Sequence, residues 1–140
     1  MPVQRADVEI ITDRERVSAA IFLPADFSPE DLFEGDEPFF PADVGGKIRF
    51  FARCSVASIT LDASDAPPES VETLGLPFDV RAVTVRLRNG TTMAGTLMCA
   101  KGRSRTLDFL NQRTKSLALH GDGKVHHIAK GHVDHIEETR

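Results

Sequence analysis

The sequence predicts an all-β protein built from two tandem five-stranded barrels, each with one short helix. Three observations lead to this prediction. A segment near the end of the chain repeats a segment of the first half. Short alternating apolar and polar segments, bounded by turn residues, precede each copy. A run rich in proline, serine and acidic residues lies between the two copies.

The repeat aligns without gaps at an offset of 77 residues, which places residues 48–59 on residues 125–136. Five apolar positions and one basic position are kept in this alignment. The matched pairs are Ile48 with Val125, Phe51 with Ile128, Ala52 with Ala129, Arg53 with Lys130, Val56 with Val133, and Ile59 with Ile136. The front halves follow at offsets one or two residues shorter. A tandem duplication is therefore the interpretation.

Each copy is expected to begin with a hairpin, formed by residues 8–12 with 17–23 and by residues 83–88 with 92–98. Asn89-Gly90 predicts a two-residue turn in the second hairpin. A short helical turn follows at 28–33 and at 104–111, with Ser28 as its N-cap in the first copy and Asn111 at its end in the second.

Three short strands complete each copy, around residues 39–40, 47–53 and 55–61, then at 116–120, 124–130 and 132–137. A glycine within the second of the five strands suits a small, strongly bent barrel. Apolar residues at i and i+3 in the matched ending predict a bulge or sharp bend in the last two strands.

These elements predict a first domain at 1–62, a linker at 63–76 and a second domain at 77–140. Residues 1–76 hold 6 Lys and Arg against 15 Asp and Glu, whereas residues 77–140 hold 11 against 6. Residues 1–76 are therefore acidic, at −9, and the second domain is basic, at +5. Such an asymmetry can steer an anionic partner to the second domain, or dock halves of opposite charge head to tail between molecules; a surface bias without function is the equal alternative.

The second copy resembles the Sm family of small, SH3-like barrels. Leu87-Arg88-Asn89-Gly90 followed by residues 93–97 resembles the first Sm motif, and residues 129–136 are similar to the second Sm motif and to the Lys-His segment of the bacterial RNA chaperone Hfq. The resemblance implies ring assembly and RNA contact near Asn111, Lys130 and His132. The segment 107–111 also resembles short bacterial domains of unknown function, which implies a fold and no activity.

Composition limits the other classes of function. The absence of Trp and Tyr weakens a single-stranded nucleic acid platform. No apolar run has the length of a signal sequence or membrane span, so a cytoplasmic protein without membrane contact is expected. Cys54 and Cys99 are too few for a disulfide scaffold; they are expected to be reduced and partly buried, with a redox pair as the alternative.

No catalytic residue and no cofactor are predicted. Asp134 with Ser104 or Cys99 as a nucleophile is the nearest approach to a catalytic set, and nothing fixes its geometry. All five histidines lie in the last 21 residues. His126 and His135, expected to face one another on adjacent strands, are the candidates for a metal site, but no ligand spacing supports a metal and solvent-facing histidines are the preferred interpretation.

Binding is assigned to a basic surface of the second copy, whose candidate residues are Arg86, Arg88, Lys101, Arg103, Arg105, Asn111, Lys130 and His132. The alternative is a solvated face that guards a sheet edge against aggregation. In the acidic segment 31–40 of the first copy, the phenylalanines are expected in the core, with a partly exposed subset at a protein contact as the alternative. The predicted function is non-enzymatic binding of a protein partner or of further copies; the alternative is RNA or other nucleic acid binding.

Overall fold

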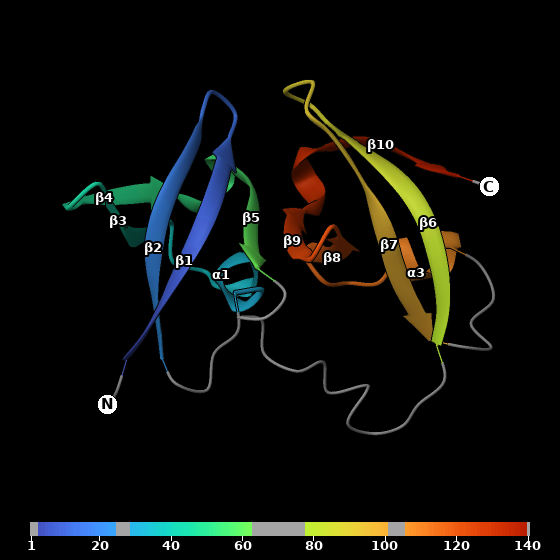
Figure 1. Ribbon diagram of the computed structural model, residues 1–140, viewed down its shortest axis with the longest axis horizontal. Helices are drawn as coiled ribbons and strands as arrows, with labels where there is room; N and C mark the ends of the chain where they lie inside the picture. The colour runs from blue at the N-terminus through green and yellow to red at the C-terminus, as the bar shows by residue number, and fades with distance from the viewer. Residues whose placement is uncertain (1–2, 25–28, 63–77, 101–105, 140) are drawn as a thin grey trace.

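The computed structural model describes residues 3–24, 29–62, 78–100 and 106–139. It confirms an all-β protein: ten antiparallel strands form one open sheet in the order β10-β6-β7-β8-β9-β5-β1-β2-β3-β4 (Figure 1). The strands are β1 (Val3–Thr12), β2 (Arg16–Pro24), β3 (Phe39–Val44), β4 (Lys47–Ala52), β5 (Val56–Asp62), β6 (Phe78–Leu87), β7 (Thr92–Ala100), β8 (Ser116–Gly121), β9 (Lys124–Ala129) and β10 (Val133–Glu138). Two short helices, α1 (Asp31–Glu34) and α3 (Thr106–Leu110), follow the two hairpins.

The two halves of the sheet have the same order of elements and the same strand registers. Ile10 lies opposite Val17 in the first hairpin, and Val85 lies opposite Met93 at the corresponding place in the second. The third and fourth strands pair Phe40 with Phe51 and, 77 residues later, Leu117 with Ile128. A register shift also occurs at corresponding places in the β1–β5 and β6–β10 pairs.

The expected pair of closed five-stranded barrels is not observed. Each strand has two edges, and β5 uses them to pair with β1 and β9, so neither edge is left for β4. At the two ends of the sheet, β4 pairs only with β3 and β10 only with β6 in the described part of the chain. The sheet is therefore continuous from one half to the other and open at both ends.

Each half encloses its own cluster of buried side chains. The first cluster includes Ile10, Ile21 and Ile59, and the second includes Leu97 and Leu119. Ile11 of β1 and Ala57 of β5 belong to the second cluster, although they lie in the first half of the chain. The halves are thus joined through side-chain packing as well as through the sheet. The linker predicted at 63–76 lies outside the described residues.

The i and i+3 pattern of the matched endings corresponds to a 3₁₀ turn between two strands. The turns η1 (Arg53–Ser55) and η2 (Lys130–His132) redirect the chain between β4 and β5 and between β9 and β10. The bend was predicted correctly, and the turn is its cause: residues within it leave the alternation of a strand.

Several local predictions need correction. The second hairpin has a wider turn than Asn89-Gly90 alone: β6 ends at Leu87, β7 begins at Thr92, and the Leu87 amide donates to the Thr91 carbonyl oxygen at 2.8 Å. Ser28 lies outside the described residues, and α1 begins after Glu30 without a side-chain cap. Cys54 is exposed, not partly buried.

None of the helices in the described ranges is long and apolar enough to cross a membrane.

Candidate functional site at the open edges of the sheet

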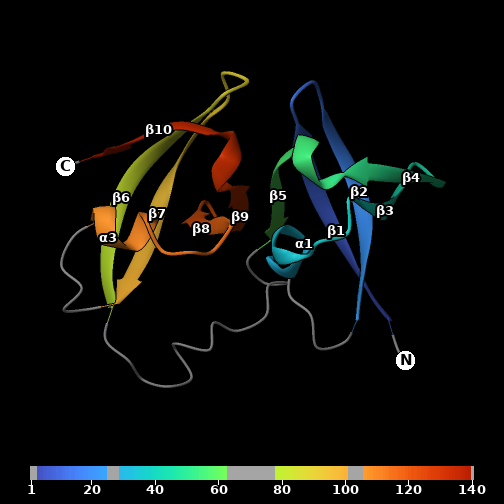
Figure 2. The ribbon, with the colours of Figure 1, turned by 180° about the vertical axis from the view of Figure 1, so that it is seen from behind.

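The junction between the halves shows how this chain covers a sheet edge. Strand β5 runs antiparallel to β9 and places Ile59 opposite His127, Thr60 opposite His126 and Leu61 opposite Val125. The two strands are neighbours in Figures 1 and 2. Thr60 Oγ1 lies 2.7 Å from His126 Nδ1, and Lys124 Nζ lies 3.9 Å from Asp62 Oδ1. Backbone pairing, apolar contact and polar contact therefore occur together along this edge.

Burial at the junction depresses the pKa of both histidines on β9. The pKa of His127 is lowered to about 4, mainly by desolvation and to a smaller extent by the nearby His120 and His126. The pKa of His126 is lowered by burial and then by Lys124. His127 Nδ1 is buried without a hydrogen-bond partner, so protonation there would place an uncompensated charge inside the junction.

Strand β4 corresponds to β9 and presents the same face uncovered. Its Phe50 is 68% exposed and its Ile48 is 55% exposed, whereas the corresponding His127 and Val125 are 7% and 5% exposed. Phe39 and Pro41 of β3 lie on the same face, opposite Ala52 and Phe50, and are also exposed. We call Phe39, Pro41, Ile48 and Phe50 the edge patch.

The edge patch is unusual for its position. Three of the large apolar side chains that the described residues expose, Phe39, Ile48 and Phe50, gather on this one hairpin at the end of the sheet. Edge strands with exposed backbone groups are templates for pairing with another strand, and contiguous apolar surface marks interaction sites. Lys47 and Arg49 are exposed on β4 and make this edge basic, with Arg49 paired to Glu15 at 2.6 Å.

Strand β10 forms the opposite end of the sheet and corresponds to β5. Asp134, Glu137 and Glu138 are exposed along it, so this edge is acidic. Ile136 packs only partly against the second core, whereas the corresponding Ile59 is fully buried in the first core. The exposed edges thus carry charges opposite to those of the halves that contain them.

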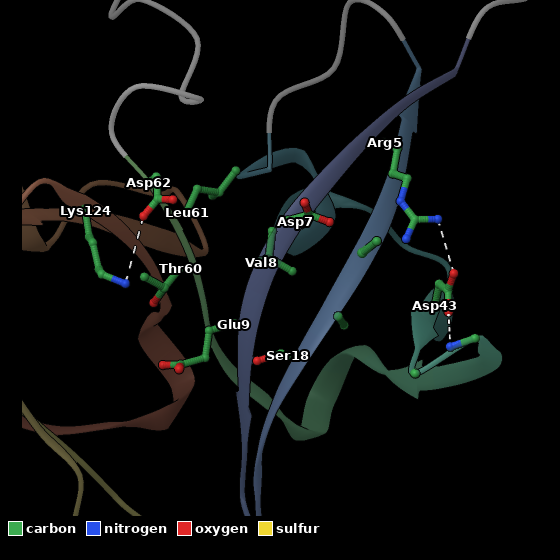
Figure 3. Close-up of a pocket in the computed structure, with 14 residues that line it drawn as sticks. Arg5, Asp7, Val8, Glu9, Ser18, Asp43, Thr60, Leu61, Asp62 and Lys124 are labelled. Atoms are coloured by element: carbon green, nitrogen blue, oxygen red, sulfur yellow. Dashed lines mark hydrogen bonds and ion pairs between the residues drawn. The ribbon is translucent and has the colours of Figure 1, made fainter.

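An open hollow of about 570 Å³ lies along β1, β2 and β5 (Figure 3). Its charged groups are engaged with one another at the surface: Arg5 pairs with Asp43 at 3.2 Å, and Lys124 with Asp62 at 3.9 Å. Asp43 also accepts from the Gly46 amide at 2.8 Å. The hollow is shallow and polar, and it offers no arrangement of nucleophile and base for chemistry.

A second set of contacts ties the halves together at the 3₁₀ turns. His132 Nε2 lies 2.6 Å from the Cys54 carbonyl oxygen, and its Nδ1 lies 3.3 Å from Asp13 Oδ1. Glu34 accepts from the Lys115 amide at 2.6 Å. His132, expected at a binding surface, is therefore engaged inside the molecule.

Of the remaining predicted binding residues, Arg88 lies beside His132, since its backbone amide donates to the His132 carbonyl oxygen at 2.9 Å. Arg86 and Arg88 are exposed at the end of β6, and Asn111 is exposed just after α3. Lys130 donates to the Gln112 carbonyl at 2.8 Å and to Thr114 at 3.0 Å, and partial burial lowers its pKa. Lys101, Arg103 and Arg105 lie outside the described residues.

The proposed pairing of His126 with His135 is wrong. Strand β9 pairs with β8 and β5, and β10 pairs with β6, so the two histidines lie at opposite ends of the second half. His126 contacts Thr60, and His135 lies 2.7 Å from Asp134. Among the described residues, no group of three or more histidine, cysteine or acidic side chains is placed to hold a metal ion.

The phenylalanines of segment 31–40 divide between core and surface. Phe40 is buried against Phe51, Phe33 is half-buried, and Phe39 is exposed. Sequence reasoning missed the edge patch, since it assigned these side chains to a closed barrel. The signal was the mismatch within the repeat, where Phe50 corresponds to the polar His127.

The chain matches no protein-family model, no curated protein and no solved structure.

Proposed function

We propose that this protein is a non-enzymatic interaction module that binds a β-strand of a protein partner along the edge of β4. The observation that carries the proposal is the contrast between Phe50 and its counterpart His127. The same position is buried where a strand lies alongside it and 68% exposed where no strand does. Strand addition of this kind takes its affinity from main-chain hydrogen bonds and its specificity from alternate side chains.

The chain itself supplies a working example of such a complex. Strand β5 covers β9 through backbone pairing, through Ile59 and Leu61 on one face, and through the Thr60–His126 contact on the other. A partner strand at β4 would bury Phe50 and Ile48 in the same manner. At about 25 cal/mol for each Å² of apolar surface, covering two large side chains favours association by several kcal/mol before entropic costs.

The test is the size of the complex that the protein forms in extracts of its native cell. The wild type is expected to elute well above its 15.3 kDa mass. The double variant Ile48→Asp with Phe50→Asp should elute as a monomer, because charge on this face opposes burial against a partner strand. Val80→Asp, at a residue of β6 that is 58% exposed, is the matched control and should leave the complex intact.

Two outcomes would refute the proposal. A wild-type protein that elutes at its own mass has no partner in the extract. A complex that survives the Ile48 and Phe50 substitutions uses another surface.

Nucleic acid binding is the second candidate. The exposure of Arg86 and Arg88 beside one another at the end of β6 supports it. The carboxylates of the neighbouring strand β10 and the internal hydrogen bonds of Lys130 weigh against a continuous basic surface. We therefore place protein binding first.

A further inference from the structure

The two free ends of the sheet correspond to the two strands that meet inside the chain. Strand β4 has the place in the first half that β9 has in the second, and β10 has the place that β5 has in the first. The internal β5–β9 contact is therefore a contact between a fifth strand and a fourth strand of two like units. Each molecule retains one unused fifth strand and one unused fourth strand.

Resting on the proposed function, we infer that the strand bound at β4 is β10 of a second copy of this chain, in the register of the internal junction. Shifting each junction residue by 77 positions places Ile136 opposite Phe50 and Glu137 opposite Arg49. Glu138 then lies opposite Ile48. The partner edges thus bring a half-buried isoleucine to the most exposed phenylalanine, and a carboxylate to a guanidinium.

Burial on the two sides agrees with this pairing. Ile59 reaches full burial with His127 opposite it, while Ile136 remains half-buried with its outer edge uncovered. Phe50 and Ile48 are the exposed counterparts of buried β9 residues. The β10–β4 contact would cover Phe50 with Ile136, whereas Ile48 would lie opposite Glu138.

Charge agrees as well. The exposed cations of β4 are Lys47 and Arg49, and β10 carries the exposed carboxylates of Asp134, Glu137 and Glu138. Arg49 holds Glu15 at 2.6 Å, and its exposed guanidinium has further donors for a second carboxylate. Two copies of β4 would oppose like charges, as would two copies of β10, so the charges favour the unlike pair.

The contact is head-to-tail, since each copy offers one edge of each kind. Such heterologous contacts continue from copy to copy until rotation closes a ring, or they extend as a filament. The sheet order within the chain is already the first step of this series.

Sedimentation of the purified full-length chain over a range of concentrations tests the inference. The mass should rise above 15.3 kDa in steps of one chain. Arg49→Glu and Glu137→Arg should each weaken self-association by roughly tenfold, since each replaces an attractive cross-strand pair with like charges. Combining both changes in one chain should restore association, because the pair is then reversed and attractive.

The control combines Arg49→Glu with Glu138→Arg, which has the same net charge but places the new arginine opposite Ile48. The self-association of this control variant should stay weak. A wild-type chain that is monomeric at all concentrations overturns the inference. So does a control variant that recovers self-association as fully as the variant that combines Arg49→Glu with Glu137→Arg. If the purified chain is monomeric while the complex in cell extract still depends on Phe50 and Ile48, the proposed function stands and the partner is a different protein.

Discussion

The junction histidine His127 should make the stability of this protein depend on pH. Its pKa of about 4 in the folded state compares with 6.5 for an exposed histidine. The unfolded chain therefore binds more protons than the folded chain between these values, so stability is complete above about pH 6.5 and falls as the pH falls toward 4. For one such group the loss between pH 7.5 and 4.5 is about 2.5 kcal/mol.

The assay is urea unfolding of the wild type and of His127→Phe across this pH range. Phenylalanine is the residue at the corresponding position of β4, and it cannot be protonated. The difference in unfolding free energy between the two proteins should change by about 2.5 kcal/mol as the pH falls, with the variant gaining on the wild type. Titrating carboxylates affect both proteins alike and cancel in the difference.

A second variant, His127→Leu, separates the effect of charge from the effect of shape. Both replacements should remove the same part of the pH dependence, even if their stabilities at pH 7.5 differ. Parallel curves for the wild type and both variants would show that His127 is protonated in the folded state as readily as in the unfolded chain. The conclusion that His127 is buried away from water between β5 and β9 would then be wrong.

Two further predictions concern the second half. Gly95→Ala should lower the unfolding free energy by about 1–3 kcal/mol in thermal or urea unfolding, because the added Cβ would lie 2.6 Å from the His120 carbonyl oxygen. Gly131 has open space around it, so the control Gly131→Ala should change stability little. Equal effects of the two substitutions would contradict this packing argument. If the second half binds RNA, retention at low salt should fall for Arg86→Ala with Arg88→Ala but not for Lys130→Ala, whose ammonium is bonded within the chain; equal losses would place Lys130 at the RNA surface.

Much of the secondary structure followed from local pattern. Alternation predicted the two hairpins, and the match at an offset of 77 residues predicted that the fourth and fifth strands of each half would correspond. Ends were less accurate: β1 and β6 begin five residues before their predicted starts. The residue at which a strand ends depends on how far the neighbouring strand continues to pair with it. The local pattern of one strand does not show how long its neighbour is.

Most of the candidate site could not be predicted from the sequence. A basic composition indicated a basic binding surface, but Lys130 and His132 form hydrogen bonds across the fold that only tertiary contacts create. The phenylalanines of segment 31–40 were expected in the core, yet Phe39 is exposed. Because Phe50 and Phe51 are adjacent in a strand, one of the two must face outward, and only the structure shows that it is Phe50.

The sequence alone determined that this is a β protein with two like halves of opposite charge, since composition and periodicity are local properties. Only the tertiary structure decided that β5 pairs with β9, so that the sheet stays open and β4 and β10 become its ends. A strand carries the same hydrogen-bonding groups on both edges whatever its sequence, so the choice of neighbour depends on which strand the folded chain brings alongside.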